Sequence, residues 1–340
     1  MTNIYDIPKD EMIKWLEAKN VKSFKATQIF EWLYDKRVKS FDEMTNLKKE
    51  FIEELKENFS IEDISIKRKQ QNETTLKYLF ELNDGNFIEA VVMKHDYGNS
   101  VCVSSQIGCN MGCAFCESGR LKKVRDLLPG EMVSQLLKIE EDSNLKINSI
   151  VIMGIGEPFD NYENIIKFMK IVNDPKGLAI GARHITVSTS GIVPKIYEFS
   201  DFPLQINLAV SLHAPNDEIR NKIMKINRAY NIKELIEAIK SYIEKTNRRV
   251  TIEYVLLKGI NDSNECAHEL CELLKGINVY VNLIPYNETS NLGFEKTSEN
   301  VKMEFYEIIR KSGITVTVRR EFGGNIDAAC GQLRANEVKE

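Results

Sequence analysis

Three cysteines, Cys109, Cys113 and Cys116, lie within a stretch of eight residues. Three thiolates from one loop can bind three irons of a [4Fe–4S] cubane, and the fourth iron then stays open to an exogenous ligand. A structural zinc site would need a fourth protein ligand, which His95 or Cys102 could supply. The spacing therefore favours an iron–sulfur cluster and leaves zinc as the alternative.

Other candidate ligands follow the segments that resemble strands. The segment 154–158 carries Gly156 and Glu157, where a glycine lets the backbone approach a ligand and a carboxylate can accept hydrogen bonds from an ammonium group. Two further strand ends offer Ser188, Ser211, Leu212 and His213. A serine at a strand end is more often a turn or cap residue, so its position beside the other groups is what makes it a candidate.

Strands and helices alternate along the chain from about residue 98. Strand patterns cover 100–106, 149–154, 184–190, 206–212, 250–257 and 279–286. Helical patterns lie around 130–142, 161–173, 232–246, 263–275 and 297–312. Such alternation indicates parallel βαβ units, and six of them predict an α/β fold with a partial (β/α)6 barrel whose chemistry lies at the carboxyl ends of the strands. A last strand at 315–321 leads into a tail that carries Cys330.

The chain before the barrel divides into two patterns. Residues 1–60 carry apolar residues at helical spacing, whereas 64–94 alternate with period two around a hairpin signal at Asp84-Gly85. We therefore expect four parts: a helical accessory domain that contacts RNA, a β-hairpin connector, a barrel and a tail with a substrate cysteine. Their predicted bounds are 1–60, 61–97, 98–322 and 323–340.

The composition is that of a globular protein. Of 340 residues, 43% are hydrophobic and 28% are charged, and no apolar run approaches the roughly 18 residues that span a bilayer. The first twenty residues lack the apolar core of a secretory signal, so a soluble, cytoplasmic protein without membrane contact is expected. Seven cysteines in such a chain favour metal binding or catalysis over a disulfide framework.

Local basic groups leave RNA binding open despite a net charge of −4. That charge argues against a protein that coats nucleic acid along its whole surface. Two basic groups flank the second helix and the predicted barrel mouth, and each is either a solvated face or a contact to RNA phosphates. They comprise Lys22, Lys25, Lys36, Arg37 and Lys39, and Lys122, Lys123, Arg125, Arg319 and Arg320.

The cysteine spacing, with Phe115 directly before Cys116, resembles that of the radical S-adenosylmethionine (SAM) superfamily. In that superfamily the open iron chelates the amino and carboxylate groups of SAM, and an injected electron cleaves it to a 5′-deoxyadenosyl radical. The resemblance implies that Glu157 and the strand-end residues named above bind SAM.

Four motifs narrow the resemblance to the RlmN/Cfr family of RNA adenine methyltransferases. They are CVSSQIGC at 102–109, SLHAP at 211–215, NLIPYN at 282–287 and IDAACGQL at 326–333. The likeness covers nearly the whole chain. It implies methylation of a ring carbon of adenine in 23S ribosomal RNA, with transfer RNA as a further candidate, and adds Asn287 to the SAM-binding residues.

The resemblance also implies a mechanism that uses two SAM molecules per turnover. One methylates Cys330, and the second yields the radical that removes a hydrogen atom from the S-methyl group. The methylene radical adds to the adenine, the adduct loses an electron and the ring proton, and Cys102 resolves it by forming a disulfide. Glu89 matches the family's proton acceptor. From sequence alone, the two cysteines could equally be core thiols, and Glu89 a surface charge of the hairpin.

The target carbon is less strongly indicated. Pro158 resembles the C2-methylating branch, whereas the segment 320–323 resembles the C8-methylating, antibiotic-resistance branch as much as the other. Glu117-Ser118 stands where the family has Ala-Ser or Ala-Thr, in a loop near the substrate. We favour C2, because it is the more widespread activity.

The expected partners follow from the same resemblance. They are an RNA substrate and an electron donor such as a flavodoxin or ferredoxin, and a monomer is expected. The competing hypotheses are a radical enzyme with a protein or small-molecule substrate, and an RNA-binding protein with structural zinc.

Overall fold

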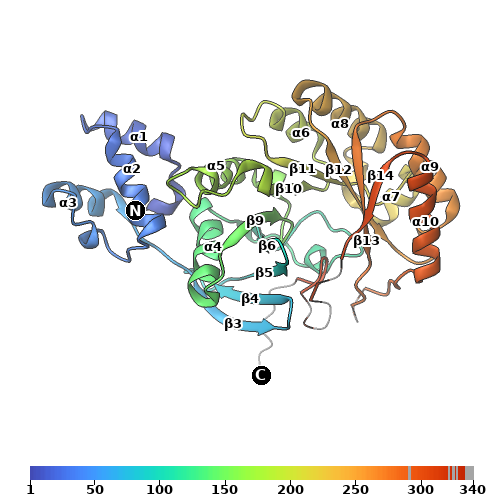
Figure 1. Cartoon of the computed structure of the whole chain (residues 1–340), viewed down its shortest axis with the longest axis horizontal. Helices are drawn as coiled ribbons and strands as arrows, with labels where there is room; N and C mark the ends of the chain where they lie inside the picture. The colour runs from blue at the N-terminus through green and yellow to red at the C-terminus, as the bar shows by residue number, and fades with distance from the viewer. Residues whose placement is uncertain (290–291, 321, 324–325, 327, 334–340) are drawn as a thin grey trace.

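The computed structural model describes residues 1–289, 292–320, 322–323, 326 and 328–333 (Figure 1). Within these residues the largest sheet has ten strands in the order β14-β13-β12-β11-β10-β9-β6-β5-β4-β3. Strands β14 and β3 lie at opposite ends of this order, so the barrel is open. Seven strands run parallel: β6 (Gly98–Cys102), β9 (Ile147–Ile152), β10 (Ile185–Thr189), β11 (Asn207–Ser211), β12 (Val250–Leu256), β13 (Val279–Pro285) and β14 (Thr315–Val318).

Helices connect the parallel strands, as βαβ units require. They are α4 (Pro129–Ser143), α5 (Tyr162–Asn173), α6 (Val193–Phe199), α7 (Asp217–Ile223), α8 (Ile232–Thr246), α9 (Asn264–Leu274) and α10 (Glu299–Lys311). The five helices expected from periodicity are confirmed. Helices α6 and α7 were not predicted, because each has only seven residues and shows too little of the repeat. The strands pack their alternate aliphatic residues into the core that these helices cover.

The concave face of the sheet carries polar side chains in register. Ser211 on β11 pairs with Glu253 on β12, which pairs with Asn282 on β13, which in turn pairs with Thr317 on β14. The residues that alternate with them point to the helices, as the period of two in a strand requires. The barrel therefore presents a polar row to its interior near the carboxyl ends of the strands.

The three antiparallel strands are β3 (Ser65–Gln71), β4 (Thr75–Glu81) and β5 (Phe87–His95). The predicted hairpin joins β4 to β5, and Gly85 takes a positive φ of 79° in its turn. These strands continue into the parallel sheet, because β5 also pairs antiparallel with β6. The sheet is thus continuous through residue 97, where the sequence suggested a boundary.

The amino-terminal segment contains α1 (Lys9–Ala18), α2 (Phe24–Phe30) and α3 (Lys49–Asn58), which lie to one side of the sheet (Figure 1). Strand β1 (Thr2–Asn3) pairs with β2 (Phe59–Ser60) and so joins its two ends. The apolar positions that predicted these helices are largely buried. Those under 10% exposed are Met12, Leu16, Ala26, Ile29, Phe30, Leu33, Met44, Leu47 and Leu55.

Polar contacts attach this segment to α4 and α5. The Asp6 carboxylate accepts a hydrogen bond of 2.7 Å from the backbone N–H of Gly130, in the first turn of α4. Lysines of α5 pair with acids of α1, at 2.8 Å for Lys167–Glu11 and 2.9 Å for Lys170–Asp10. Burial raises the pKa of Asp6 to about 6, although the bond from Gly130 opposes that rise.

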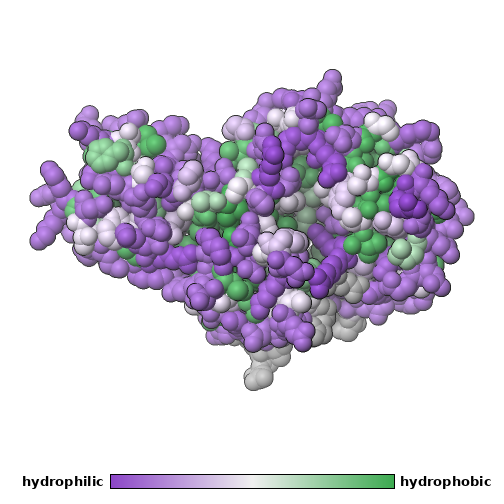
Figure 2. All heavy atoms as spheres, viewed as in Figure 1, coloured by the Kyte–Doolittle hydropathy of each residue, from purple (hydrophilic) through white to green (hydrophobic). Residues whose placement is uncertain are grey.

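The surface in view is mainly hydrophilic, with smaller hydrophobic areas among the polar residues (Figure 2). Among the described residues, no helix combines the length and the apolar composition needed to span a bilayer.

The raised pKa of Asp6 predicts a pH-dependent stability. The folded protein holds the proton more tightly than the unfolded chain, so stability should fall as pH rises from about 4, near the ordinary value of 3.8, to about 6. Relative to Asp6→Asn, the wild-type free energy of unfolding should fall by about 1–2 kcal/mol over this window, measured by urea unfolding. Asp10→Asn is the control, because the Lys170 ammonium there outweighs burial and lowers the pKa. A parallel pH profile for wild type and Asp6→Asn would contradict the prediction.

Candidate active site at the mouth of the open barrel

The loop with the three cysteines is closed by backbone pairing. It leaves β7 (Gln106–Ile107), returns at β8 (Arg125–Asp126) and contains the short helix η4 (Glu117–Arg120). A Cβ on Gly108 would lie 2.1 Å from the Lys122 carbonyl oxygen, so this close crossing requires glycine. The Cys109 N–H donates to the Leu121 carbonyl at 2.9 Å and holds the two sides together.

The three thiols lie near one another in this loop. Burial raises the pKa of Cys113 well above its usual range, and the neighbouring Cys116 and Cys109 thiols raise it further. Among the described residues, no three His, Cys, Asp or Glu side chains are grouped closely enough to ligate a single metal ion. A cubane needs only one thiolate for each of its irons. The three thiols of this loop therefore suit a cubane with one open iron, and zinc stays the alternative that the sequence left open.

Glu157 follows β9 and lies beside this loop. Its side chain is 3% exposed, and its two oxygens accept backbone hydrogen bonds from Phe159 at 3.0 Å and Ser190 at 2.7 Å. Burial raises its pKa, although these bonds oppose the rise. Gly156 precedes it with a φ of 111°, and a Cβ there would come within 2.6 Å of the Gln106 side chain. The carboxylate is thus held rigidly where a bound ammonium group would offset its burial.

The strand ends next to Glu157 carry further polar groups. Ser188 on β10 is half-buried, and Ser190 follows it with a buried hydroxyl that has no hydrogen-bond partner in the described structure. The hydroxyl nevertheless lies close enough to the Glu157 carboxylate to lower its pKa. Ser190 was not among the predicted residues, and its position after a strand was the signal that could have found it.

His213, after β11, is fixed as a neutral imidazole. Its Nδ1 accepts a hydrogen bond of 3.0 Å from the Val255 N–H, and its ring meets Phe115 of the cysteine loop edge to face at 4.9 Å. Burial and the Arg220 and Arg319 guanidinium groups lower its pKa to about 3. The proton of the neutral ring is therefore on Nε2, which can donate. Its neighbour Leu212 is fully buried, and its side chain can offer only apolar contact.

Arg220 on α7 lies beside the site, and the sequence did not reveal it. Its side chain is fully buried and donates to the carbonyls of Ser190 at 2.7 Å, Ser211 at 3.1 Å and Leu212 at 3.1 Å. It also donates to the Asn227 side chain at 2.9 Å. Burial lowers its pKa to about 10, although the Cys113 thiol opposes this. One guanidinium therefore joins the ends of two strands and places a positive charge near the cysteine loop.

The carboxyl-terminal tail binds directly to the cysteine loop. The Glu117 N–H donates to the Gly331 carbonyl at 2.8 Å, and the Ser118 hydroxyl donates to the Leu333 carbonyl at 2.7 Å. The Gln332 side chain reaches the Glu288 carbonyl after β13 at 3.4 Å. Glu117 is the position at which the chain departs from the resemblance, and its backbone N–H, together with the Ser118 hydroxyl, holds the tail.

These contacts bring Cys330 and Cys102 to the same region. Cys330 is exposed, and its thiol accepts a hydrogen bond from Arg319. The positive charge of Arg319 also interacts electrostatically with the Cys102 thiol. Burial, and then the nearby Cys330 thiol, raise the pKa of Cys102 to about 12. Arg319 lies 3.7 Å from a carboxylate oxygen of Glu253, which also accepts a 2.8 Å bond from Asn282. Arg319 therefore faces the two thiols, and the alternative of a solvated surface is wrong for it.

Glu89 is not the surface charge that its hairpin suggested. Its side chain is 1% exposed and lies 2.9 Å from the ammonium of Lys77, which is also buried. Glu89 is two residues from Val91, the partner of Cys102, so it points to the same face of the sheet as that cysteine. Asn287 follows β13 and is half-buried near the tail contact.

Two of the basic residues near the loop are paired within the protein. Lys123 lies 2.8 Å from both Asp126 and Asp160, and Arg125 lies 2.7 Å from both Asp84 and Glu131. Pairing offsets most of their positive charge, so they are weaker candidates for RNA phosphates than the sequence suggested.

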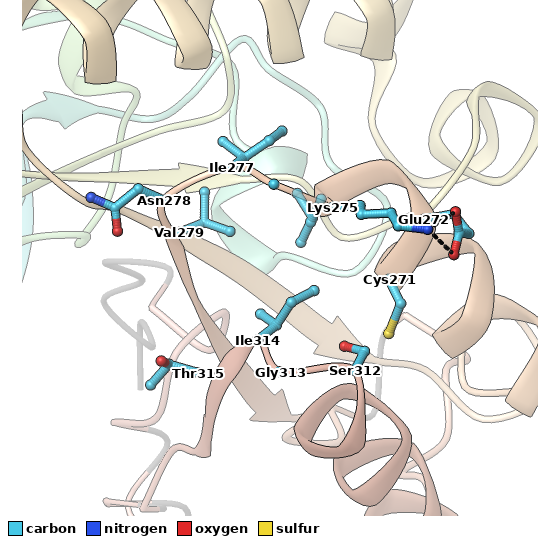
Figure 3. A pocket seen from close by; sticks show the side chains of 12 residues that line it. Cys271, Glu272, Lys275, Ile277, Asn278, Val279, Ser312, Gly313, Ile314 and Thr315 are labelled. Carbon is cyan, nitrogen blue, oxygen red and sulfur yellow. Dashed lines mark hydrogen bonds and ion pairs between the residues drawn. The ribbon is translucent and has the colours of Figure 1, made fainter.

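A separate pocket of about 540 Å³ lies at the other end of the barrel. Its walls come from the end of α9, the turn before β14 and the first residues of β13 and β14 (Figure 3). Val279 and Thr315 begin those strands, whereas the cysteine loop lies beyond strand carboxyl ends. This pocket is therefore not part of the site.

The chain is similar to known proteins over nearly its whole length. Family models described as "Radical SAM superfamily" and "Ribosomal RNA large subunit methyltransferase N-terminal domain" match residues 103–274 and 2–61. A "Probable dual-specificity RNA methyltransferase RlmN" of Acholeplasma laidlawii is 51% identical, covering 98% of this chain and 99% of that protein. The protein so described from Geobacillus kaustophilus is 54% identical, covering 100% and 94%. A crystal structure of a radical SAM methyltransferase from Sphaerobacter thermophilus superposes with a TM-score of 0.91 at 42% identity, covering 99% of this chain and all of that one.

Replacement of Arg220 should destabilise the fold. Arg220→Lys keeps the charge but lacks the planar fork, so several buried carbonyls would lose their donors, at a cost of about 3 kcal/mol in the free energy of unfolding. Urea unfolding measures this, with Lys222→Ala on the same helix as control. Lys222 is exposed and should change stability by no more than about 0.5 kcal/mol. Equal stability of the two variants would show that the Arg220 hydrogen bonds make no net contribution to the free energy of unfolding.

Loss of one cluster thiol should abolish cluster binding. After anaerobic reconstitution, Cys113→Ala should hold much less iron and sulfide than the wild-type protein and lose its broad visible absorption, because three thiolates are the fewest that bind the cubane here. Cys266→Ala is the control, since Cys266 is a buried residue of α9 away from the loop. Bound zinc in place of iron in the wild-type protein would refute the cluster assignment.

Proposed function

Because the chain belongs to the RlmN family of radical SAM RNA methyltransferases, we propose that it methylates C2 of an adenine in 23S ribosomal RNA and in transfer RNA. The observation that carries this proposal is the tail thiol of Cys330, which lies beside the cysteine loop and near Cys102. A radical enzyme that acts on a protein or a small molecule would need no such thiol.

The cofactors of the superfamily are a [4Fe–4S] cluster and SAM. We propose that Cys109, Cys113 and Cys116 hold the cluster, which with two SAM molecules per turnover would supply the methyl group and the one-electron chemistry. Glu157 is suited to bind the ammonium group of the methionyl part, because its buried carboxylate is already oriented by two backbone N–H groups. Gly156, Ser188, Ser211, Leu212, His213 and Asn287 complete the proposed SAM site.

Cys330 would accept the methyl group and carry it to the adenine. A thiolate is the nucleophilic form of cysteine, and the hydrogen bond and charge of Arg319 favour it. Cys330 is exposed as a residue, but the protein that surrounds its thiol desolvates it and raises its pKa. The short tail contacts to Glu117 and Ser118 hold this thiol at the mouth of the barrel. Arg319 would also help to position the Cys330 thiol, through the hydrogen bond that it donates to this sulfur.

Cys102 would release the product by attacking the sulfur of Cys330. A disulfide then forms between the two residues as the bond from the Cys330 sulfur to the methylene carbon breaks; that carbon keeps the electron pair and takes a proton, equivalent to the one that the Cys102 thiol gives up, and becomes the methyl group. Glu89 would accept the ring proton, and its ion pair of 2.9 Å with Lys77 would hold the carboxylate in place. The adenine must leave its stack to reach these groups, as in other enzymes that modify bases.

The remaining parts of the chain would serve RNA binding. We propose that residues 1–60 contact the RNA backbone through their lysines, that 61–97 link them to the barrel of 98–322, and that the tail of 323–340 presents Cys330. Part of that tail, 334–340, lies outside the described residues. A flavodoxin or ferredoxin would donate the electron to the monomeric protein.

Mass spectrometry of nucleosides tests the target carbon. The reconstituted protein should convert ribosomal and transfer RNA to 2-methyladenosine under anaerobic conditions with SAM and a reductant. Formation of 8-methyladenosine would instead assign the chain to the resistance branch. Deoxyadenosine without any methyladenosine would show that RNA is the wrong substrate.

Replacement of Cys330 and of Cys102 should stop the reaction at different steps. Cys330→Ala should form no methyladenosine, whereas Cys102→Ala should accumulate a covalent protein–RNA adduct, visible as a shifted band on a denaturing gel that ribonuclease removes. Cys271→Ala is the control, because Cys271 is buried on α9 near the opposite end of the barrel. Normal turnover by Cys330→Ala would exclude the S-methylcysteine route.

A further inference from the structure

An exposed stack of rings lies at the turn between β5 and β6. The Tyr97 side chain is 81% exposed and stacks on the His95 ring, with centroids 4.7 Å apart and planes at 13°. Phe322 meets the other side of this group, with its ring 4.8 Å from His95 at 73°. The guanidinium of Arg320 lies 5.3 Å from the Phe322 ring centroid. Three rings and one cation from two distant segments thus form one continuous surface group.

This stack is connected to the segment that carries Cys330. The Ala328 N–H donates to the carbonyl of Gly323, the residue after Phe322, at 2.9 Å, and Ala328 is two residues from Cys330. On the strand side, His95 is four residues from Val91, the partner of Cys102, and points to the same face. That separation is about 13 Å along the strand. The stack therefore lies near the thiols but outside the SAM-binding groups.

The chemistry of the stack favours a nucleobase. A tyrosine ring with one face against His95 and the other open to solvent can extend the stack by one more flat ring, and every base offers such a face. An adenine that is extruded for methylation leaves its neighbours without a stacking partner, which an aromatic side chain can replace. The carboxylate of Asp96, next to Tyr97, would repel a phosphate group. A phosphate would therefore bind at the Arg320 end of the stack.

We propose that Tyr97, supported by His95 and Phe322, stacks on an unpaired base beside the adenine to be methylated, and that Arg320 binds a phosphate of the same strand. This interaction rests on the proposed function and adds a base-stacking surface to it. It contributes to RNA affinity and to the placement of the extruded adenine, and it takes no part in the chemistry at the cluster.

Fluorescence of 2-aminopurine tests the proposal. RNA hairpins of the substrate sequence would carry 2-aminopurine at single positions beside the target adenine, because its fluorescence is quenched when it stacks. Wild-type protein and Tyr97→Phe should quench one of these positions and bind with similar Kd, whereas Tyr97→Ala should lose the quench and bind about tenfold more weakly. Tyr97→Leu keeps the bulk without the π face and should resemble Tyr97→Ala.

Controls separate stacking from folding and from the proposed function. Tyr197→Ala removes a tyrosine on α6 that is 42% exposed and should behave as wild type. SAM cleavage to 5′-deoxyadenosine without RNA should be equal in all variants, which shows that the site is intact. If wild type methylates the hairpin while Tyr97→Ala binds and quenches as well as wild type does, the stacking proposal is wrong and the function stands. If wild type forms no methyladenosine on this RNA, the proposed function fails and the stacking proposal fails with it.

Discussion

Two hydrogen bonds between the tail and the cysteine loop determine how the site is assembled. They run from the Glu117 N–H and the Ser118 hydroxyl to the carbonyls of Gly331 and Leu333, and so hold the three residues that follow Cys330. Because the barrel is open between β14 and β3, a tail from the last strand can cross to the loop after β6. The open sheet and the docked tail together bring Cys330 and Cys102 to one place.

Buried charges set the electrostatics around this place. Arg220, Glu157 and Glu253 are each at most 3% exposed, and their hydrogen bonds go mainly to strand ends and to neighbouring side chains. Burying a charged group costs free energy unless its donors and acceptors all have hydrogen-bond partners. These three side chains therefore hold the strand ends in place. The carboxylate of Glu157 and the neutral imidazole of His213 face the cysteine loop. The polar side of the sheet is thus rigid before any ligand binds.

The sequence predicted the features whose signals are local. The cysteine spacing, the helices α4 and α8 and the strands of the parallel sheet follow from short patterns, and the structure contains them. Arg220 could not be predicted, because it lies in a charged segment that looks like solvated surface and its partners are distant strand ends. The Ser118–Leu333 bond joins positions 215 residues apart, which no periodicity signals. The pairing of β5 with β6 was missed because strand patterns do not specify their neighbours.

The hydrogen bonds from Glu117 and Ser118 hold the tail through backbone carbonyl groups, which affects the substitutions that the tail can accept. Every amino acid has a carbonyl group, so the bond from Ser118 does not itself restrict the side chain at position 333. The Leu333 side chain is nevertheless only 5% exposed and packs with Val91, Ile155 and Ala328, so burial keeps this position apolar. Position 331 is under a different constraint, because its φ of 84° favours glycine. Divergence in this family should therefore be limited to apolar side chains at the first position and to glycine at the second.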